Sequence, residues 1–288
     1  MIPGKFEYFA PSTLPEAVKM LAEHGYGAKI LAGGQSLIPA MRFRLAAPEV
    51  LIDINRIDGL SYIKEVNGHL TIGAMTHEAD IDASPLIHQK YPLLADTAIV
   101  IADPLVRNMA TVGGNLAHAD PANDHPATML AYNAQVVAIG PDGERVIPID
   151  EFFVDLFASS LAENEILKEI RVPTPPAHSG GAYIKIERKV GDYAVAAVAV
   201  QLTLDGNVCQ SARIGLTNVT PFPRRATNAE AALAGQPLTE DTIRAAGVAA
   251  AQDCEPSSDL RGSVEYKRDV VRVITMRAIR KAVERANR

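Results

Sequence analysis

Two glycine pairs, at residues 33–34 and 113–114, constrain this chain more than any other feature of its sequence. The first pair lies in the segment Lys29-Ile30-Leu31-Ala32-Gly33-Gly34-Gln35-Ser36-Leu37, and Leu37, Met41 and Leu45 follow at helical spacing. This pattern predicts a short buried strand, a turn and the start of a helix. Glycines at such a turn let the backbone approach a ligand closely, and the exposed N–H groups attract anions, phosphate above all.

The second pair lies in Thr111-Val112-Gly113-Gly114-Asn115, which predicts a second turn of the same kind. Most glycine pairs are merely turns, but two that face each other across one pyrophosphate favour a dinucleotide ligand. The sequence contains no G-x-x-x-x-G-K-[ST] and no G-x-G-x-x-G after a strand. It therefore supports neither a P-loop nor a Rossmann phosphate turn.

Polar side chains near the glycines supply further candidate contacts. Ser36 would add a hydroxyl at a helix N-terminus, with a plain serine cap as the alternative. Thr111 and Asn115 would donate to the second phosphate. Asp124 would accept from ribose hydroxyls, and its alternative role is a helix cap. Tyr193, at a strand break, suits either stacking on an aromatic ring or half-buried packing.

Charge and hydropathy restrict the classes of function. The formal net charge of −6 and the pI near 5.7 argue against general nucleic-acid binding, which needs a positive excess. The longest apolar run, from Tyr193 to Val200, is far shorter than the roughly 20 residues that cross a bilayer. Because Met1-Ile2-Pro3-Gly4-Lys5 does not resemble the start of a signal peptide, we expect a cytoplasmic protein.

The sequence lacks the ligand spacing of a metal site. Its two cysteines form no C-x-x-C, so an iron–sulfur cluster or a four-ligand zinc site would have to sit on another chain. His118, Asp120, Asp124 and His125 have suitable side chains but not the register that fixes a metal ion. We therefore expect hydrogen bonding from these four residues, and no metal on this chain.

The hydrophobic pattern predicts an α+β protein whose organisation changes near residue 178, where prolines and a glycine pair cluster. Before that point we expect helices over 14–24, from 37 onward, over 92–102 and through 129–130, strands at 29–32, 50–54, 70–74, 135–139, 146–149 and 165–172, and an extended stretch at 107–110. Beyond it we expect strands at 183–189, 194–204 and 208–217, then helices at 228–233, 240–251 and 263–285.

Several of these segments together carry a family resemblance. The opening Met1-Ile2-Pro3 with Phe6-x-Tyr8-x-x-Pro11, the two glycine segments and Glu265-Tyr266-Lys267-Arg268 resemble the FAD-binding subunits of molybdenum hydroxylases. Within that family, the chain is most similar to the medium subunits of aerobic carbon monoxide dehydrogenases. The resemblance covers the whole chain. It implies a two-lobed FAD-binding domain of the vanillyl-alcohol-oxidase (PCMH) type over 1–177, with lobes at about 1–55 and 56–177, and a C-terminal α+β domain over 178–288 that closes over the flavin.

The resemblance also implies roles for individual residues. The FAD diphosphate would be held by two sets, Ile30, Leu31, Ala32, Gly33, Gly34, Gln35, Ser36 and Leu37, and Thr111, Val112, Gly113, Gly114 and Asn115. The remaining implied contacts are Asp124 on the adenosine side, Ile101 and Lys185 near the isoalloxazine, the backbone of Ile166 or Leu167 at the ring or adenine, and Tyr193 over one flavin face.

The implied function is electron transfer within a larger complex. A large subunit would oxidise substrate at its molybdenum cofactor, a small subunit would carry two [2Fe–2S] clusters, and FAD on this chain would pass electrons to a quinone or another carrier. No residue of this chain would be catalytic toward substrate. We expect a cytoplasmic dimer of heterotrimers that binds no nucleic acid and contacts the inner face of the membrane only peripherally.

Other functions stay open at this point. The partner subunit would oxidise carbon monoxide, an aldehyde or an N-heterocycle, because the determinants of substrate lie on another chain. A self-contained flavin oxidase is a second class, and it would want a catalytic base that is not identifiable in the sequence. A nucleotide-binding module without a redox role is a third.

Overall fold

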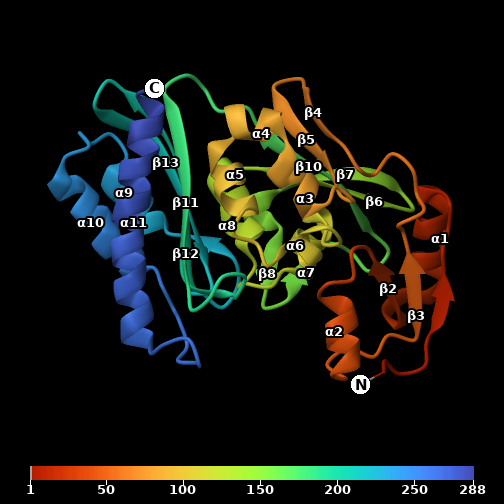
Figure 1. Ribbon diagram of the computed structural model, residues 1–288. Coiled ribbons are helices and arrows are strands. Elements are labelled where there is room, and N and C mark those ends of the chain that lie inside the picture. Colours follow the sequence, from red (N-terminus) through yellow and green to blue (C-terminus); the bar gives the residue numbers. More distant parts are fainter. Residues whose placement is uncertain (1) are drawn as a thin grey trace.

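The computed structural model describes residues 2–288, which form three successive packed regions (Figure 1). The first is an N-terminal lobe with a three-stranded sheet, the second a middle region with a five-stranded sheet, and the third a C-terminal region with a four-stranded sheet. In Figure 1 the N-terminal lobe and the C-terminal region lie on opposite sides of the middle region. None of the helices in the described part is long and apolar enough to cross a membrane.

The N-terminal lobe packs α1 against a parallel sheet in the order β1-β3-β2. Its elements are β1 Glu7–Phe9, α1 Leu14–His24, the 3-10 helix η1 Gly25–Gly27, β2 Ala28–Leu31, α2 Leu37–Arg42 and β3 Val50–Asp53. α1 begins as predicted, because the Thr13 hydroxyl accepts a hydrogen bond from the Glu16 N–H. It ends at Gly25, whose φ of +51° suits glycine.

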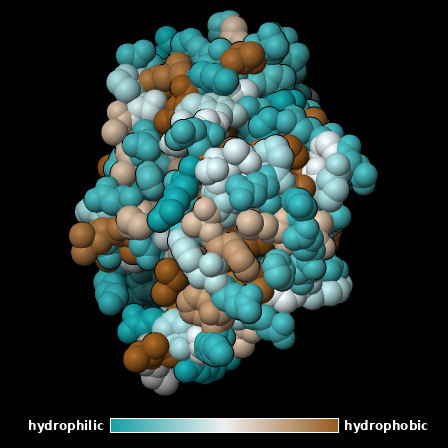
Figure 2. Space-filling model, turned by 90° about the vertical axis from the view of Figure 1, so that its right-hand side faces the viewer, coloured by the Kyte–Doolittle hydropathy of each residue, from teal (hydrophilic) through white to brown (hydrophobic). Residues whose placement is uncertain are grey.

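The helix after the first glycine pair is shorter than predicted. α2 ends at Arg42, and Arg44 adopts a left-handed φ of +63° that cannot continue a helix. Leu45, which was predicted to extend the apolar stripe, is instead 83% exposed. Ile38 and Phe43 are exposed as well. Figure 2, which faces the side of the N-terminal lobe, shows apolar patches separated by hydrophilic residues.

The middle region is an antiparallel sheet in the order β4-β5-β10-β6-β7, covered by short helices. Its strands are β4 Ile63–Val66, β5 His69–Gly73, β6 Gln135–Gly140, β7 Gly143–Pro148, β10 Ile166–Pro173 and a separate pair, β8 Phe153–Asp155 and β9 Ala158–Ser159. Its helices are α3 Glu78–Ala83, α4 Pro85–Lys90, α5 Pro92–Ala98, α6 Pro104–Arg107, α7 Val112–His118, α8 Asp124–Tyr132 and the 3-10 helix η2 Ile149–Glu151. Every residue of α8 is buried, so this helix lies at the centre of the molecule.

Two predictions for this region are wrong. The helix expected over 92–102 ends at Ala98, and in the stretch expected to be extended at 107–110, Arg107 ends α6 and Asn108 and Met109 form a turn. α6 forms because the Asp103 carboxylate accepts from the N–H groups of Leu105 and Val106, while Pro104 supplies the first helical residue. The Asp-Pro pair is a helix-start signal that outweighs the polar, irregular look of the surrounding sequence.

The C-terminal region is an antiparallel sheet in the order β11-β12-β13-β14, packed between helices on both faces. Its elements are β11 Ser179–Glu187, β12 Ala194–Asp205, β13 Val208–Thr217, β14 Arg224–Arg225, α9 Thr227–Leu233, α10 Glu240–Gln252 and α11 Val264–Ala286. Figure 1 shows α11 running along the outer face of this sheet, with α5 and α8 on the other side. The strands and helices predicted after residue 178 are confirmed to within a few residues at their ends.

β12 shows why this sheet can be covered on both faces. Its residues alternate between two cores: Val198 and Val200 pack with the C-terminal helices, whereas Ala197 and Ala199 pack with the middle region. The two sides therefore share one strand. Small residues also bring β13 close to α8, since a Cβ added to Gly215 would lie 2.1 Å from the Ala127 carbonyl oxygen.

Candidate functional site

The two glycine segments, far apart in sequence, lie against each other where the N-terminal lobe meets the middle region. A Cβ added to Gly33 would lie 2.0 Å from the carbonyl oxygen of Met109, just before the second segment. A Cβ added to Gly114 would lie 3.6 Å from the Cβ of Ala32. The contact at Gly33 requires glycine, because no Cβ fits against the Met109 backbone, whereas the distance at Gly114 is an ordinary van der Waals contact. The segments thus form one continuous surface, and its contact with a diphosphate stays a prediction.

The first segment has backbone donors without partners. The N–H groups of Gly33, Gly34, Gln35 and Ser36 donate no hydrogen bond to any other residue of 2–288. Gly34 has a φ of +73°, which favours glycine. The Ser36 side chain makes no capping bond to α2, so the plain serine cap is not what the structure shows. Consecutive free N–H groups at such a bend form a concavity suited to an anion.

The second segment is built differently, and the prediction that it forms a turn of the same kind is wrong. Val112 and Gly113 form the first turn of α7, and their N–H groups donate to Thr76 and Ala74 carbonyl oxygens at 3.0 Å. The Gly114 N–H donates to the Thr111 hydroxyl oxygen at 3.2 Å. These amides are therefore already used. The prediction missed this because α7 begins at an N-capping threonine rather than after a strand.

Two polar groups of the second segment remain available to a ligand. The Thr111 hydroxyl accepts one hydrogen bond and can still donate its proton. The Oδ1 atom of Asn115 is buried and has no hydrogen-bond partner among residues 2–288. A buried polar atom without a partner is costly unless a ligand or water completes its hydrogen bonding. The free N–H groups of the first segment therefore fit the charged diphosphate of a dinucleotide, whereas the orphaned Asn115 oxygen is an acceptor and fits a hydroxyl or N–H group of the ligand.

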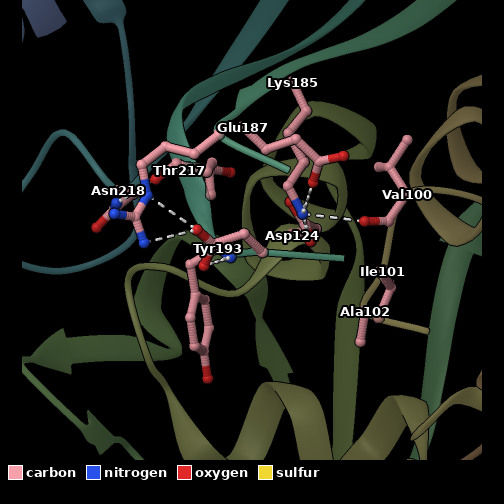
Figure 3. Close-up of polar contacts among 12 residues, drawn as sticks. Val100, Ile101, Ala102, Asp124, Lys185, Glu187, Tyr193, Thr217 and Asn218 are labelled. Atoms are coloured by element: carbon pink, nitrogen blue, oxygen red, sulfur yellow. Dashed lines mark hydrogen bonds and ion pairs between the residues drawn. The ribbon is translucent and has the colours of Figure 1, made fainter. Parts of the chain in front are cut away.

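A buried ion pair joins two further predicted residues. The Nζ atom of Lys185 on β11 donates to Asp124 Oδ2 and to the Val100 carbonyl oxygen, both at 2.9 Å (Figure 3). Tyr183, two residues earlier on the same strand, donates from its hydroxyl to Asp124 Oδ1 at 2.6 Å. The Lys185 and Asp124 side chains are only 3% and 8% exposed. Asp124 is the first residue of α8 and not its cap, which is Asn123.

Electrostatics within this cluster favour a fixed arrangement. Burial raises the pKa of Asp124, while the neighbouring Lys185 ammonium and the Tyr183 hydroxyl act in the opposite direction. Burial and the Asp124 carboxylate raise the pKa of Tyr183 well above its ordinary value, so its hydroxyl keeps its proton and donates. Because both carboxylate oxygens already accept one bond, a ribose hydroxyl would have to use the remaining lone pairs.

Tyr193 lies beside this cluster but points away from it. Tyr193 is 46% exposed, and in Figure 3 its ring points down and away from Lys185 and Asp124, with Ile101 and Ala102 on the right-hand side of the view. The turn that carries Tyr193 packs on the same residues, since a Cβ added to Gly191 would lie 3.1 Å from the Ala102 carbonyl oxygen. The Ile101 side chain is buried. The structure thus brings Ile101, Lys185 and Tyr193 into one neighbourhood, and their contact with a flavin ring stays a prediction.

The side chains of three other predicted site residues, Ile166, Leu167 and Val112, lie in the hydrophobic cores. Ile166 and Leu167, at the start of β10, are buried in different cores, that of the N-terminal lobe and that of the middle region. The Val112 side chain is fully buried in the core of the middle region. These side chains position the segments that carry them. Their predicted ligand contacts are not tested by the geometry.

The structure adds residues that the sequence reasoning missed. Tyr183 and Glu187 flank Lys185 on the same face of β11, and Glu187 Oε2 lies 3.7 Å from the Lys185 ammonium. The guanidinium of Arg261 lies 5.6 Å from the centre of the Tyr193 ring. The period of two in a strand would have identified Tyr183 and Glu187 as neighbours of Lys185. No local signal connects Arg261 with Tyr193.

The four residues weighed as metal ligands have other roles. His125 Nε2 and Glu78 Oε2 share a hydrogen bond of 2.6 Å between fully buried side chains. The His118 ring tilts against Phe157, and burial lowers the pKa of His118. Within the described residues, no group of three or more histidines, cysteines and acidic residues is placed to hold a metal ion.

Known proteins match this chain over nearly its whole length. Residues 4–175 match the family model of the FAD binding domain in molybdopterin dehydrogenase, and residues 181–282 match that of the CO dehydrogenase flavoprotein C-terminal domain. The chain is 46% identical to the carbon monoxide dehydrogenase medium chain of Hydrogenophaga pseudoflava, over 98% of each chain. It is 39% identical to the 6-hydroxypseudooxynicotine dehydrogenase complex subunit alpha of Paenarthrobacter nicotinovorans, over 99% of this chain and 97% of that one.

A solved structure gives the same picture. Carbon monoxide dehydrogenase from Hydrogenophaga pseudoflava, in a form lacking the Mo-pyranopterin moiety of its molybdenum cofactor, contains a chain that superposes with a TM-score of 0.97. The two sequences are 48% identical, and the match covers 99% of each chain. These comparisons confirm the predicted family and the predicted fold class, a mixed FAD-binding domain followed by a C-terminal domain with sheet and helices.

Proposed function

The chain belongs to the family of FAD-binding flavoprotein subunits of molybdopterin dehydrogenases, and from that premise we propose that it relays electrons within such an enzyme. In this proposal the chain takes electrons from [2Fe–2S] clusters on a small partner subunit and passes them to an external acceptor such as a quinone. A large partner subunit oxidises the substrate at its molybdenum cofactor. FAD supplies the chemistry, because it accepts electrons singly and passes them on in pairs.

The observation that carries the proposal is the meeting of the two glycine segments. The acceptor Oδ1 of Asn115 has no donor among residues 2–288, and the N–H donors of Gly33 to Ser36 have no acceptor there. The diphosphate of FAD has the charge and the acceptor oxygens that such donors need. The segment Ile30 to Leu37 and the segment Thr111 to Asn115 would hold it, and Asp124 would lie on the adenosine side.

The chain's own residues orient the ring and limit solvent around it. Lys185 is held by Asp124 and the Val100 carbonyl, so its ammonium has a fixed position beside the predicted ring site. Ile101 contributes an apolar wall, and the Tyr193 ring would cover one flavin face. Ile166 or Leu167 would contribute a backbone contact. No nucleophile or general base acting on substrate is assigned to this chain.

The assembly and the substrate are also proposals. The similarity to a carbon monoxide dehydrogenase medium chain supports carbon monoxide as the substrate of the large subunit. We propose a dimer of heterotrimers as the assembly. The similarity to a 6-hydroxypseudooxynicotine dehydrogenase subunit supports an N-heterocycle as one alternative, and the similarity to a glyceraldehyde dehydrogenase medium chain supports an aldehyde as another. We place the complex in the cytoplasm, with peripheral contact at the inner face of the membrane. In this proposal the FAD-binding domain ends at residue 177 and the C-terminal domain begins at residue 178.

Anaerobic spectroscopy of the assembled complex tests the relay. The chain is co-produced with its molybdenum and iron–sulfur partners, the FAD content is measured, and carbon monoxide, an aldehyde and an N-heterocycle are added in turn. We expect the visible absorbance of the oxidised flavin to bleach with one substrate class only. Flavin that stays oxidised with every substrate while the molybdenum centre is reduced contradicts the relay.

The same spectra separate the rival classes. The isolated chain, supplied with FAD, should not bleach with any of these substrates. Bleaching of the isolated chain would show a self-contained flavin oxidase. Absence of bound FAD from both the isolated chain and the intact complex would contradict the proposed cofactor role itself.

A further inference from the structure

The segment Glu265-Tyr266-Lys267-Arg268 supports the resemblance but contributes no residue to the proposed site. Lys267, near the start of α11, is only 1% exposed, and its Nζ atom contacts the Ser257 carbonyl oxygen and Asp259 Oδ2, both at 2.9 Å. A buried ammonium needs such partners, because its desolvation is costly. Lys267 therefore ties α11 to the segment 254–262, which connects α10 to α11.

The tied segment ends in a tight turn that presents Arg261. Asp259 Oδ1 accepts from the N–H groups of Arg261 and Gly262, at 2.8 and 3.2 Å. The other oxygen of the same carboxylate pairs with Lys267. One carboxylate thus joins the buried lysine to the turn, so that the position of Arg261 depends on the start of α11.

Arg261 contacts the Tyr193 segment in two ways. Its Nη2 atom donates to Asp192 Oδ1 at 2.7 Å, and its guanidinium carbon lies 5.6 Å from the centre of the Tyr193 ring. The same Asp192 oxygen accepts from the Tyr193 N–H at 2.8 Å. The hydrogen bond from Arg261 lowers the pKa of Asp192 to about 2, so the carboxylate is charged at neutral pH. A planar cation near an aromatic face is attractive and orients both groups.

The opposite side of the turn is fixed as well. Gly191 packs against the Ala102 carbonyl, and Arg188 pairs with the second oxygen of Asp192 at 3.0 Å. Tyr193 itself is 46% exposed. The backbone of Tyr193 is thus held from both sides, and the guanidinium of Arg261 contacts the ring itself.

We propose that Arg261 is a positioning residue that holds the Tyr193 ring in the orientation needed to cover the flavin, with Lys267 and Asp259 fixing Arg261 in turn. The inference rests on the proposed function, since it concerns the ring that covers the FAD site. It connects α11, at the outer face of the C-terminal region, with the site through contacts of the Lys267, Asp259 and Arg261 side chains.

A flavin-independent experiment tests the positioning. The sequence contains no tryptophan, so Tyr193→Trp introduces the only indole of the full chain. In this background Arg261→Gln should lower the anisotropy of indole fluorescence and raise its quenching by acrylamide about twofold or more, because the cation that orders the ring is lost. Arg261→Lys should lie between the two, because it keeps a charge but loses the planar stacking group.

The fold should survive these changes, because Asp192 keeps its pair with Arg188. Arg244→Gln is the matched control: its side chain is 67% exposed, and its pair with Asp241 spans 3.6 Å within one helix. This control should leave the indole signal unchanged. Equal indole signals with and without Arg261→Gln would overturn the proposed positioning.

A second measurement uses the FAD-loaded complex and a double-mutant cycle. Arg261→Gln should weaken FAD binding about fivefold and raise flavin fluorescence in the presence of Tyr193. In a Tyr193→Leu background the same change should have almost no effect on either quantity, because Arg261 acts through that ring. Equal effects in both backgrounds would overturn the inference. If the unaltered complex binds no FAD while the indole responds as expected, the proposed function fails and the positioning contact stands.

Discussion

The two glycine segments have almost the same sequence decoration but use their backbones in different ways. In the first, the N–H groups of Gly33 to Ser36 have no partner among residues 2–288. In the second, the N–H groups of Val112, Gly113 and Gly114 are bonded to Thr76, Ala74 and Thr111. A glycine pair therefore indicates that something approaches the backbone closely, but not whether it is a ligand or another part of the chain.

The difference assigns separate tasks to the two segments. The first presents donors to an anion, and the second builds the floor against which the first rests. Side chains of the second segment, notably Asn115, can still reach the ligand. Backbone substitutions in the second segment should therefore mainly lower fold stability, whereas those in the first should mainly lower FAD affinity. Four substitutions test this expectation, described from the largest expected effect to the smallest.

Gly113→Ala should have the largest effect, mainly on stability. The added Cβ would lie 2.5 Å from the Cβ of Ala74 and 2.7 Å from its backbone, so α7 would have to move. We expect the free energy of unfolding to fall by about 3 kcal/mol without any ligand present. Thermal unfolding of the full chain measures this, with Gly4→Ala as control, because nothing lies within 4 Å of that position. Unchanged unfolding of Gly113→Ala would remove the structural role given to the second segment.

Gly34→Ala should have the opposite pattern, with a small loss of stability and a large loss of FAD affinity. Its φ of +73° costs an L-residue about 1–2 kcal/mol, and the nearest atoms to the added Cβ belong to the flexible Ile38 side chain. The loss of stability should stay within that range. FAD affinity should fall more than tenfold, because relief of the strain would rotate the free N–H groups away from the ligand. Titration of the complex with FAD, compared with its melting curve, separates the two effects.

Local signals in the sequence account for much of the fold. The Thr13 cap, the Asp205-Gly206 turn between β12 and β13, and the boundaries of α10 follow from adjacent residues, so they could be predicted. The glycine pairs could likewise be predicted to need close backbone approach. The partner of each N–H could not, because the bond from Gly113 to Ala74 depends on how β5 and α7 pack after folding.

The same limit applies to charged groups of the site. Asp124 and Lys185 were each predicted to face the ligand, yet they first face one another across 61 residues of sequence. The contact between Arg261 and Tyr193 is equally distant and has no pattern of its own. Long-range pairing of this kind is set by the arrangement of the regions, which periodicity and capping signals do not encode.

Asn115→Leu should lower FAD affinity without lowering the stability of the FAD-free chain. The buried Oδ1 has no partner in the chain, so its removal should leave the stability of the FAD-free chain unchanged or raise it by about 1 kcal/mol. FAD affinity should fall about tenfold, because the hydrogen bond that the ligand completes is lost. Unfolding without FAD and titration with FAD measure the two quantities. A clear loss of stability without FAD would show that the Asn115 oxygen already has a partner, such as an ordered water.

Ser36→Ala should have the smallest effect, and its comparison with Thr13→Ala is the most specific. Thr13 caps α1, so its replacement should cost about 1 kcal/mol of stability and leave FAD affinity unchanged. Ser36 precedes α2 without a capping bond, so its replacement should leave stability unchanged and weaken FAD binding about threefold, the value of one modest hydrogen bond. Melting curves without FAD and titrations with FAD measure both variants. If Ser36→Ala instead lowers stability as Thr13→Ala does, the hydroxyl is a cap after all, and the first segment would owe its polar residue to the helix and not to a ligand.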